Sequence, residues 1–193
     1  LIKDNLVTGR DGSVTLKNLH LGTYVVTETG TINGFTLNKS SKTVKIEYKD
    51  QTVDVQYEAA TITNTRQKAE VSVIKKDADT KNGLLGAEFT IYATNDIVNY
   101  AGEVVVSKGS ALQTIATVKG GTGAFTLDLP INNGYKIAET KAPYGYVRNT
   151  ADVYSFRFDY LADNQAKATF THTYTNERVK AKIQLNKVDL ETG

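Results

Sequence analysis

The feature that most constrains the fold of this chain is an internal repeat with a period of about 112 residues. Four pairs of segments carry the repeat: GSVTL at 12–16 with GAFTL at 123–127, YVVTE at 24–28 with YKIAE at 135–139, TNTR at 63–66 with TNER at 175–178, and VSVIK at 71–75 with IQLNK at 183–187. Segments that recur in one order indicate copies of a single structural unit. We therefore expect the chain to fold as part of a tandem array of domains.

The repeat also predicts where the domains begin and end. Residues 1–67 correspond to the C-terminal part of a repeat whose first strand is missing, and residues 68–178 form a complete repeat. Residues 179–193 correspond to the first strand of a following repeat. Because both ends of the sequence fall inside a repeat, we expect a fragment of a longer protein whose array continues in both directions.

Short runs of alternating apolar and polar residues indicate the fold class. The runs are rich in Val, Ile, Thr, Tyr and Phe, and clusters of Gly, Asn and Asp separate them. A period of two residues is typical of β-strands with one buried face, and examples lie at 12–16, 43–48 and 153–158. Helical periodicity is hard to find anywhere. We therefore expect an all-β protein with a sandwich or barrel architecture.

The composition excludes several classes of function. Cys is absent, which excludes disulfides, thiolate metal sites and Cys nucleophiles, and His20 and His172 are the only histidines. The net charge of +2 comes from charges scattered along the chain, which argues against a nucleic-acid partner. No apolar run approaches the roughly 18 residues of a membrane span. We expect no metal, no cofactor, no nucleic acid and no membrane insertion in this segment.

Three polar residues in each repeat fall in line with the apolar residues that strand alternation assigns to the core. In the complete repeat they are Lys75, Glu139 and Asn176, and their equivalents are Glu28 and Asn64 in the first repeat and Lys187 in the third. One ordinary explanation is a position at a strand end, where polar groups reach water. Another is a buried Lys–Glu ion pair with a hydrogen-bonded Asn, which is costly to desolvate. Recurrence of all three at one interval favours a chemical role.

The chemical interpretation is an amide exchange between Lys and Asn. Burial among apolar side chains lowers the pKa of a Lys, so that its neutral amine becomes available as a nucleophile. Burial raises the pKa of a Glu, which in its protonated form donates to the Asn carboxamide and passes a proton to the leaving ammonia. Attack of the Lys on the Asn amide forms an isopeptide bond in a single turnover and needs no cofactor.

Four motifs of the complete repeat together resemble one known family. They are VSVIKKD at 71–77, GLLGAEF at 83–89, YKIAETKAPYGY at 135–146 and TN at 175–176. This combination is similar to the CnaB-type domain, also called SpaA-like or prealbumin-like, which builds pilins and adhesin stalks on Gram-positive bacteria. The resemblance covers the complete repeat, the C-terminal half of the repeat before it and the opening strand of the next.

The resemblance implies tandem immunoglobulin-like, prealbumin-like sandwiches, each of two antiparallel sheets. It also implies an intramolecular isopeptide bond between the first and last strands of the complete repeat. Carried over to this sequence, Lys75 is the nucleophile, Asn176 the electrophile and Glu139 the catalytic acid/base. Glu28 and Asn64 are the equivalents in a repeat whose Lys strand is missing, and Lys187 lacks its partners here.

Two details qualify this assignment. The first repeat reads ETGTINGF at 28–35, without the Ala-Pro of the corresponding box, which affects the expected geometry of the loop after Glu28. Lys76 is an alternative nucleophile to Lys75, but alternation directs its side chain away from the core face of Val71 and Val73.

The resulting functional hypothesis is a stretch-resistant stalk or spacer of a cell-wall-associated adhesin or pilin, located outside the cell. Its expected partners are the neighbouring repeats, with head-to-tail contacts between fragments as a further possibility; the sequence identifies no host ligand. The alternative is an adhesin module that binds a host protein or glycan directly, through the loop at 97–110 or through Tyr144 and Tyr146. We do not expect a multiple-turnover enzyme, because a glycosidase needs paired carboxylates and no second acid recurs on a core face.

Overall fold

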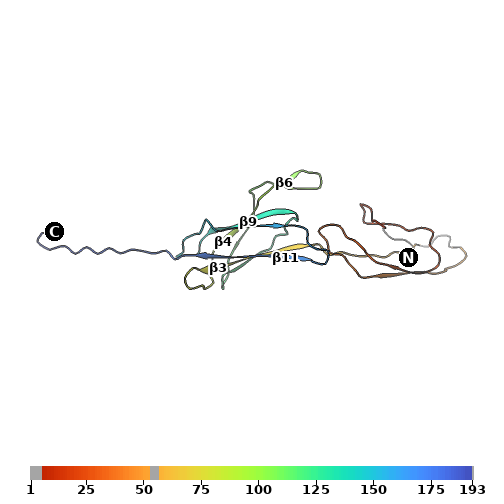
Figure 1. Ribbon diagram of the computed structural model, residues 1–193, viewed down its shortest axis with the longest axis horizontal. Helices are drawn as coiled ribbons and strands as arrows, with labels where there is room; N and C mark the ends of the chain where they lie inside the picture. The colour runs from red at the N-terminus through yellow and green to blue at the C-terminus, as the bar shows by residue number, and fades with distance from the viewer. Residues whose placement is uncertain (1–5, 53–56, 193) are drawn as a thin grey trace. The chain divides into compact units, whose positions relative to one another are not determined.

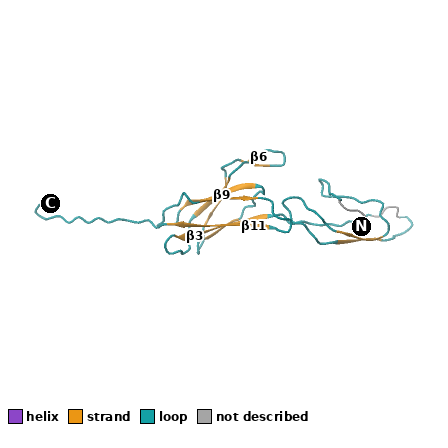
Figure 2. Ribbon diagram, in the orientation of Figure 1, coloured by secondary structure: helices purple, strands orange, loops and turns teal. Residues whose placement is uncertain are grey.

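The computed structural model describes residues 6–52 and 57–192, and within these ranges it contains strands and no helix (Figures 1 and 2). The chain divides into two compact units. Unit 1 comprises residues 1–31 and 37–64, and unit 2 comprises residues 32–36 and 65–193. The ends of the predicted first and third domains, at residues 1–5 and 193, lie outside the described residues. The domain boundaries at 67/68 and 178/179 stay predictions.

Unit 2 contains the two sheets of a β-sandwich, so the predicted all-β sandwich class is confirmed. One sheet has the order β10-β9-β4-β7, with strands Val153–Phe158, Asn133–Lys141, Glu88–Ala93 and Ala111–Ala116. The other has the order β11-β3-β8, with strands Lys167–Asn176, Lys68–Asp77 and Thr122–Phe125. The predicted strand at 153–158 coincides with β10.

One pairing departs from the expected antiparallel arrangement. The first and last strands of the sandwich, β3 and β11, run parallel over their whole lengths, from the pair Lys68 and Lys167 to the pair Asp77 and Asn176. Parallel neighbours need a long connection, and here it is the rest of the sandwich. The parallel register places the C-terminal ends of both strands side by side at one end of the unit.

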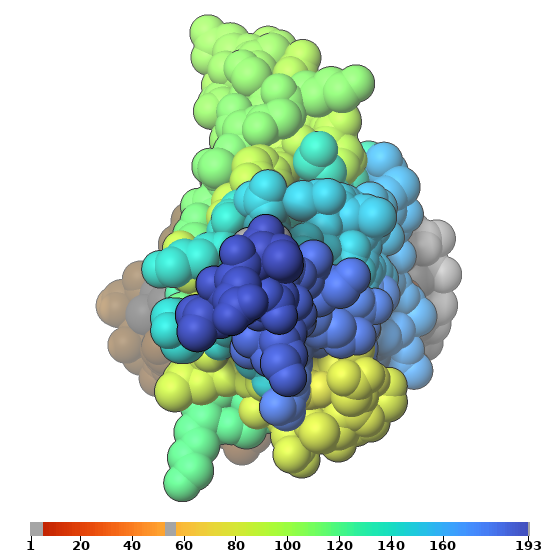
Figure 3. Space-filling model, turned by 90° about the vertical axis from the view of Figure 1, so that its left-hand side faces the viewer, coloured from red at the N-terminus to blue at the C-terminus, as the bar shows by residue number. Residues whose placement is uncertain are grey.

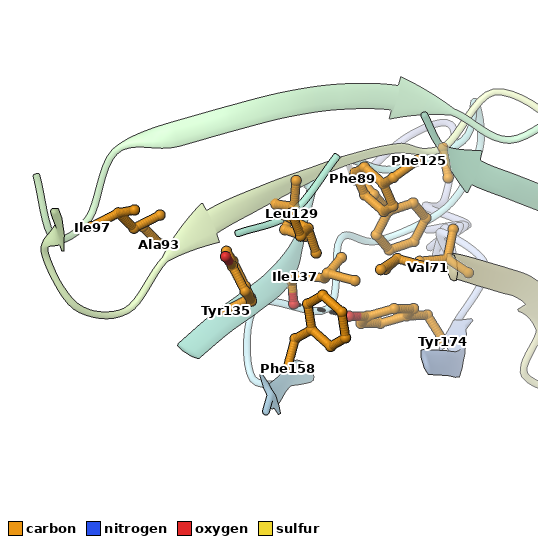
Figure 4. Close-up of a cluster of buried hydrophobic side chains, with 13 residues drawn as sticks. Val71, Phe89, Ala93, Ile97, Phe125, Leu129, Tyr135, Ile137, Phe158 and Tyr174 are labelled. Atoms are coloured by element: carbon orange, nitrogen blue, oxygen red, sulfur yellow. Dashed lines mark hydrogen bonds between the residues drawn. The ribbon is translucent and has the colours of Figure 1, made fainter. Parts of the chain in front are cut away.

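The core of unit 2 lies between the two sheets. Apolar side chains of both inner faces are fully buried there, among them Val73, Phe89, Ile91, Tyr135 and Ile137. Figure 4 shows this cluster, in which the hydroxyl of Tyr174 points at the backbone of β9 and donates a hydrogen bond to the Ile137 carbonyl oxygen at 2.9 Å. Inward residues alternate along β3, β4 and β9 as the period-two pattern predicts.

A short hairpin protrudes from the sandwich of unit 2. It consists of β5 (Ile97–Val98) and β6 (Val104–Val106), and it is visible as the green projection in Figure 3 and beside the β6 label in Figure 1. Its base is tied to the body because Ile97 is buried in the core cluster. Its outer part exposes apolar side chains, including Val98, Tyr100, Val104 and Val105.

Unit 1 has far less paired structure. Strands β1 (Gly22–Val26) and β2 (Lys42–Ile46) form a two-stranded antiparallel sheet, so the strand predicted at 43–48 is present as β2. The strand predicted at 12–16 is not formed. Its equivalent in unit 2 is β8, which pairs with β3, and the described residues of unit 1 include no counterpart of β3. Among the described residues, the buried hydrophobic core begins at Val71, so it includes no residue of unit 1.

Two adjacent glycines near the C-terminal end of β3 provide a test of the packing there. Gly120 and Gly121 both have positive φ angles, of 94° and 79°, which cost a side-chain-bearing residue about 1–2 kcal/mol. A Cβ at Gly121 would also lie 2.2 Å from the backbone oxygen of Lys75, whereas a Cβ at Gly120 meets nothing within 4 Å.

We therefore expect Gly121→Ala to lower the free energy of unfolding by about 1–3 kcal/mol more than Gly120→Ala does, because only the first forces neighbouring backbone apart. Urea unfolding of both variants measures this difference. Equal losses of stability in the two variants would contradict the close approach of the 120–121 turn to β3.

Candidate functional site

The structure brings the three predicted residues of the complete repeat together inside unit 2. Lys75 lies on β3, Glu139 on β9 and Asn176 at the end of β11. Lys75 Nζ donates a hydrogen bond to Asn176 Oδ1 at 2.5 Å, and Asn176 Nδ2 donates to Glu139 Oε1 at 2.8 Å. The Lys75 Nζ also lies 3.0 Å from Glu139 Oε1. The amine, carboxamide and carboxyl therefore form a closed cluster.

This cluster is isolated from solvent. The side chains of Lys75 and Glu139 are 0% exposed and Asn176 is 2% exposed. The rings of Phe89 and Tyr174 lie near the amine, with their centroids 5.7 and 5.9 Å from Lys75 Nζ. Burial lowers the pKa of the Lys75 amine below its ordinary value, although the hydrogen bond and the charge of Glu139 act in the opposite direction.

A backbone contact orients the Glu139 carboxyl. Its Oε2 atom accepts a hydrogen bond from the backbone amide of Asn149 at 3.2 Å, while Oε1 faces Lys75 and Asn176. Each carboxyl oxygen therefore has its own partner, and the carboxyl cannot rotate without losing both. The side-chain pattern alone did not reveal the role of residue 149, because the contact uses the main chain.

The arrangement is suited to proton transfer and acyl transfer between side chains. A neutral amine at the Lys75 position lies against the carbonyl end of the Asn176 amide. The nitrogen of that amide, which would be the leaving group, faces the Glu139 carboxyl. A group able to carry a proton from the nucleophile to the leaving nitrogen is therefore in contact with both.

The alternative nucleophile, Lys76, lies on the other face of β3. Lys76 is half-buried, whereas its neighbours Lys75 and Asp77 are fully buried, as alternation along the strand requires. None of the contacts that join Lys75 to Asn176 and Glu139 involves Lys76.

A second polar cluster lies next to the first and was not predicted as a site. We call Asp77, Tyr146 and Arg178 the clasp. Asp77 Oδ2 accepts hydrogen bonds from the Tyr146 hydroxyl at 2.7 Å and from Arg178 Nε at 2.8 Å. The Asp77 side chain is 1% exposed. The clasp therefore joins the end of β3 to the segment after β11, and Tyr146 packs at the sandwich edge, whereas Tyr144 is fully exposed.

In unit 1, Glu28 and Asn64 are in contact with one another. Asn64 Nδ2 donates to Glu28 Oε1 at 2.6 Å and to Thr31 Oγ1 at 2.8 Å. Lys187 is exposed, in a segment without strand pairing among the described residues that Figure 2 draws as loop. Within unit 1, Glu28 and Asn64 therefore keep the contact that Glu139 and Asn176 make in unit 2.

The two histidines have separate surroundings. His172 lies 2.9 Å from Asp152 through its Nε2 atom and stacks on the ring of Tyr154, while His20 is exposed and its backbone oxygen accepts a hydrogen bond from Tyr24. No group of three or more His, Cys, Asp or Glu side chains suited to a metal ion occurs in residues 6–52 and 57–192. In the same ranges no helix has the length and apolarity needed to cross a membrane.

A family model described as SpaA, prealbumin-like fold domain, matches residues 2–61 and 69–178. No curated protein matches the chain. Among solved structures, the Bacillus anthracis TIE protein is 26% identical with a TM-score of 0.62; the match covers 92% of this chain, which spans only 29% of that protein.

Pilus proteins of Lactobacillus rhamnosus GG are also similar. The C-terminal fragment of the pilus adhesin SpaC is 17% identical with a TM-score of 0.48, and the match covers 86% of this chain and 80% of that one. The shaft pilin spaA is 19% identical with a TM-score of 0.42, covering 83% of this chain and 66% of that one.

The clasp predicts a specific acid sensitivity. Hydrogen bonds from the Thr80 amide, the Tyr146 hydroxyl and Arg178 lower the pKa of Asp77 below its ordinary value of 3.8. The unfolded chain therefore takes up this proton at a higher pH than the folded chain does. The stabilisation from Asp77 is fully present above about pH 3.8 and is lost as the pH falls below it.

We expect the free energy of unfolding in urea to fall more between about pH 6 and about pH 3 in the wild type than in Asp77→Asn. Asp163→Asn, which removes one exposed negative charge elsewhere in unit 2, is the matched control and should keep the wild-type decrease. An Asp77→Asn variant with an undiminished decrease would show that the clasp does not carry the effect.

Proposed function

Because this chain belongs to the SpaA family of prealbumin-like fold domains, we propose that it is a stalk segment of a Gram-positive surface adhesin or pilin. We further propose that Lys75 and Asn176 become joined by an intramolecular isopeptide bond, with Glu139 transferring the protons. In this proposal the segments 1–67, 68–178 and 179–193 belong to successive repeats, and the protein works outside the cell, at the cell wall.

The single observation that carries the proposal is the buried cluster of amine, carboxamide and carboxyl. Moving a Lys–Glu ion pair out of water has a desolvation cost of several kcal/mol for each ion. The attraction between the two charges offsets this cost only when their geometry is excellent. Here Lys75 Nζ lies 3.0 Å from Glu139 Oε1 and 2.5 Å from Asn176 Oδ1. An uncharged amide in place of the buried ammonium removes the desolvation cost, which gives the reaction a driving force.

The proposed step balances in atoms and charge. The neutral Lys75 amine attacks Asn176 Cγ, a bond forms between Nζ and Cγ, and the bond between Cγ and Nδ2 breaks. One proton leaves Nζ, passes through the Glu139 carboxyl, and is delivered to Nδ2, which departs as ammonia. The carboxyl returns to its starting state, so the reaction occurs once for each pair and consumes no other reactant.

Such a bond would stabilise the unit and make it resist extension. Lys75 and Asn176 are 101 residues apart, and in the chain-entropy model used for disulfides a loop of this size is worth about 4.7 kcal/mol. Tension that enters along β3 would cross directly to β11 through the bond. The sheets and core between the two strands would then carry little of the load.

The exposed β5–β6 hairpin supports a second candidate function, direct binding of a host protein or glycan. Tyr100 is fully exposed at its tip, and Val98, Val104 and Val105 are more than half exposed. Apolar and aromatic side chains gathered on a protruding element are typical of contact surfaces. This role is compatible with the stalk, because the hydrogen bonds and the ion pair of Lys75, Glu139 and Asn176 involve no residue of the hairpin.

Intact mass tests the bond. The wild-type chain should be lighter than its sequence mass by one ammonia, and Lys75→Ala should restore the full mass because the nucleophile is gone. Lys76→Ala, the matched control one residue away, should lose ammonia as the wild type does. A wild-type chain of full sequence mass would show that no such bond forms. A Lys76→Ala chain of full mass beside a lighter Lys75→Ala chain would show that Lys76, and not Lys75, is the nucleophile.

Glu139→Gln separates the proton-transfer role from simple proximity. The amide side chain has the same shape and can still accept from Asn176 Nδ2, so the β-sheet circular dichroism spectrum should be unchanged. Without a group that carries protons, we expect bond formation to slow by a factor of about 100 or more, the usual size of a general acid–base contribution. Time-resolved mass spectrometry after refolding measures the rate. Wild-type kinetics would limit Glu139 to a structural role.

A further inference from the structure

We propose that Asn149 is a positioning residue for the reaction between Lys75 and Asn176. Its side chain holds in place the backbone amide that orients the Glu139 carboxyl. The inference rests on the function proposed above and adds a fourth residue to it. The contacts that join Lys75, Glu139 and Asn176 to one another do not include the side chain of Asn149, so its effect on the reaction passes through Glu139.

The backbone amide of Asn149 determines which oxygen of Glu139 faces the reacting groups. The amide donates to Oε2 at 3.2 Å, whereas Oε1 lies 3.0 Å from Lys75 Nζ and accepts from Asn176 Nδ2 at 2.8 Å. Oε1 is therefore in contact with both the nucleophile and the leaving nitrogen. While the amide holds Oε2, one oxygen can take the proton from Nζ and give it to Nδ2 without any rotation of the carboxyl.

The side chain of Asn149 restrains the backbone that carries this amide. Residues 147–152 lie outside the strands. Asn149 Oδ1 accepts a hydrogen bond from the backbone amide of Ala151 at 3.2 Å, which closes a local turn of the kind that Asn favours. On the other side, the backbone amide of Val147 donates to the Glu177 carbonyl oxygen at 2.9 Å. The amide of residue 149 is therefore held between two contacts, one of which needs the Asn side chain.

The same arrangement recurs in unit 1. The backbone amide of Asn38 donates to Glu28 Oε2 at 2.9 Å, and Asn38 Oδ1 accepts from the backbone amide of Ser40 at 3.0 Å. Asn38 precedes Asn149 by the same interval as Glu28 precedes Glu139. The turn and the carboxyl that it orients therefore recur together.

The residue types in the two loops indicate that the side chain is what matters. The segments TLNKS at 36–40 and VRNTA at 147–151 share their Asn and no other residue. Every residue except proline has a backbone N–H, so the contact with the carboxyl does not by itself require Asn. What Asn supplies in both loops is the side-chain oxygen that closes the turn.

The place of Asn149 in the fold makes its substitution informative. The residue is half-buried and borders a surface pocket that Thr175 and Glu177 also line, so a smaller side chain leaves no hole in the hydrophobic core. The loop is also attached to β11 through Asp152 Oδ1 and His172 Nε2, which are 2.9 Å apart. We therefore expect Asn149→Ala to keep the β-sheet circular dichroism spectrum of the wild type.

The rate of ammonia loss tests the proposal. Full-length chains made by cell-free synthesis with a labelling pulse, sampled at intervals by mass spectrometry, measure this rate. Hydrogen-bond partners that orient the ligands of metal sites contribute a factor of about 10–100, and we expect Asn149→Ala to slow the reaction by the same order. Asn149→Asp and Asn149→Ser keep an oxygen for the Ala151 amide, one with a charge and one without, and both should react faster than Asn149→Ala. Thr150→Ala, at the exposed next residue, is the matched control and should keep the wild-type rate.

A double-mutant cycle shows whether Asn149 acts through Glu139. In the Glu139→Gln chain no group is left to carry the proton, so adding Asn149→Ala should leave the remaining slow rate nearly unchanged. A role confined to general stability would slow the reaction by the same factor in both backgrounds.

Three outcomes would overturn the assignment: a wild-type rate in Asn149→Ala, no recovery in either Asn149→Asp or Asn149→Ser, or equal slowing with and without the Glu139 carboxyl. In each of these cases a wild-type chain that loses one ammonia would leave the Lys75–Asn176 bond standing. A wild-type chain that keeps its full mass would instead overturn the proposed function and the role of Asn149 together.

Discussion

The structure of unit 2 depends on the burial of a lysine amine beside a carboxyl in an apolar interior. Two such groups cannot leave water without compensation, and the compensation here is a closed set of contacts among Lys75, Glu139 and Asn176. Lys75 and Asn176 lie on one sheet and Glu139 on the other. The cluster therefore forms only when the sheets face each other, and Phe89 and Tyr174 then exclude water from the amine.

Strand alternation and the repeat were sufficient to predict which three polar side chains point inward. They were not sufficient to predict how the strands pair, because a period of two residues is the same in parallel and antiparallel sheets. The parallel pairing of β3 with β11 is a consequence of the whole topology. The hydrogen bond from the backbone amide of Asn149 to Glu139 also could not be predicted, because every residue except proline has a backbone N–H and its type does not indicate such a contact. Asp77 and Arg178 both lie in segments that recur, yet nothing in their spacing indicated that they meet.

Comparison of the two units separates local from global determinants of the site. Glu28 and Asn64 keep the contacts of their equivalents although the core face around them is uncovered. The segment after β1 that carries Glu28 and the loop that supplies the backbone amide of Asn38 are therefore sufficient for the hydrogen-bond geometry. Burial lowers the pKa of Lys75, which lies on β3 in the completed sandwich. The described residues of unit 1 include no counterpart of β3. The hydrogen-bond geometry is set locally, whereas the burial of the Lys75 amine depends on the two facing sheets of unit 2.

The clasp is a noncovalent contact that fixes the register of the parallel pair of β3 and β11. A slip of one residue would turn Lys75 to the opposite face of β3, so the register must be specified by contacts outside the cluster. Asp77 follows Lys75 by two residues and Arg178 follows Asn176 by two, which places the clasp on the same pair of chain segments. Toward the other end of the pair, the hydroxyls of Ser72 and Thr171 are 2.8 Å apart.

These noncovalent contacts bracket the amine and the amide, and together they hold Nζ opposite the side chain it would attack. Arg178 is 55% exposed, so its contact is the kind that salt and acid weaken. A covalent link between Lys75 and Asn176 would make the register independent of those conditions. In the proposed function, the clasp would hold β3 and β11 in register for a reaction that occurs once. The amide bond between Lys75 and Asn176 would then keep the two strands in that register.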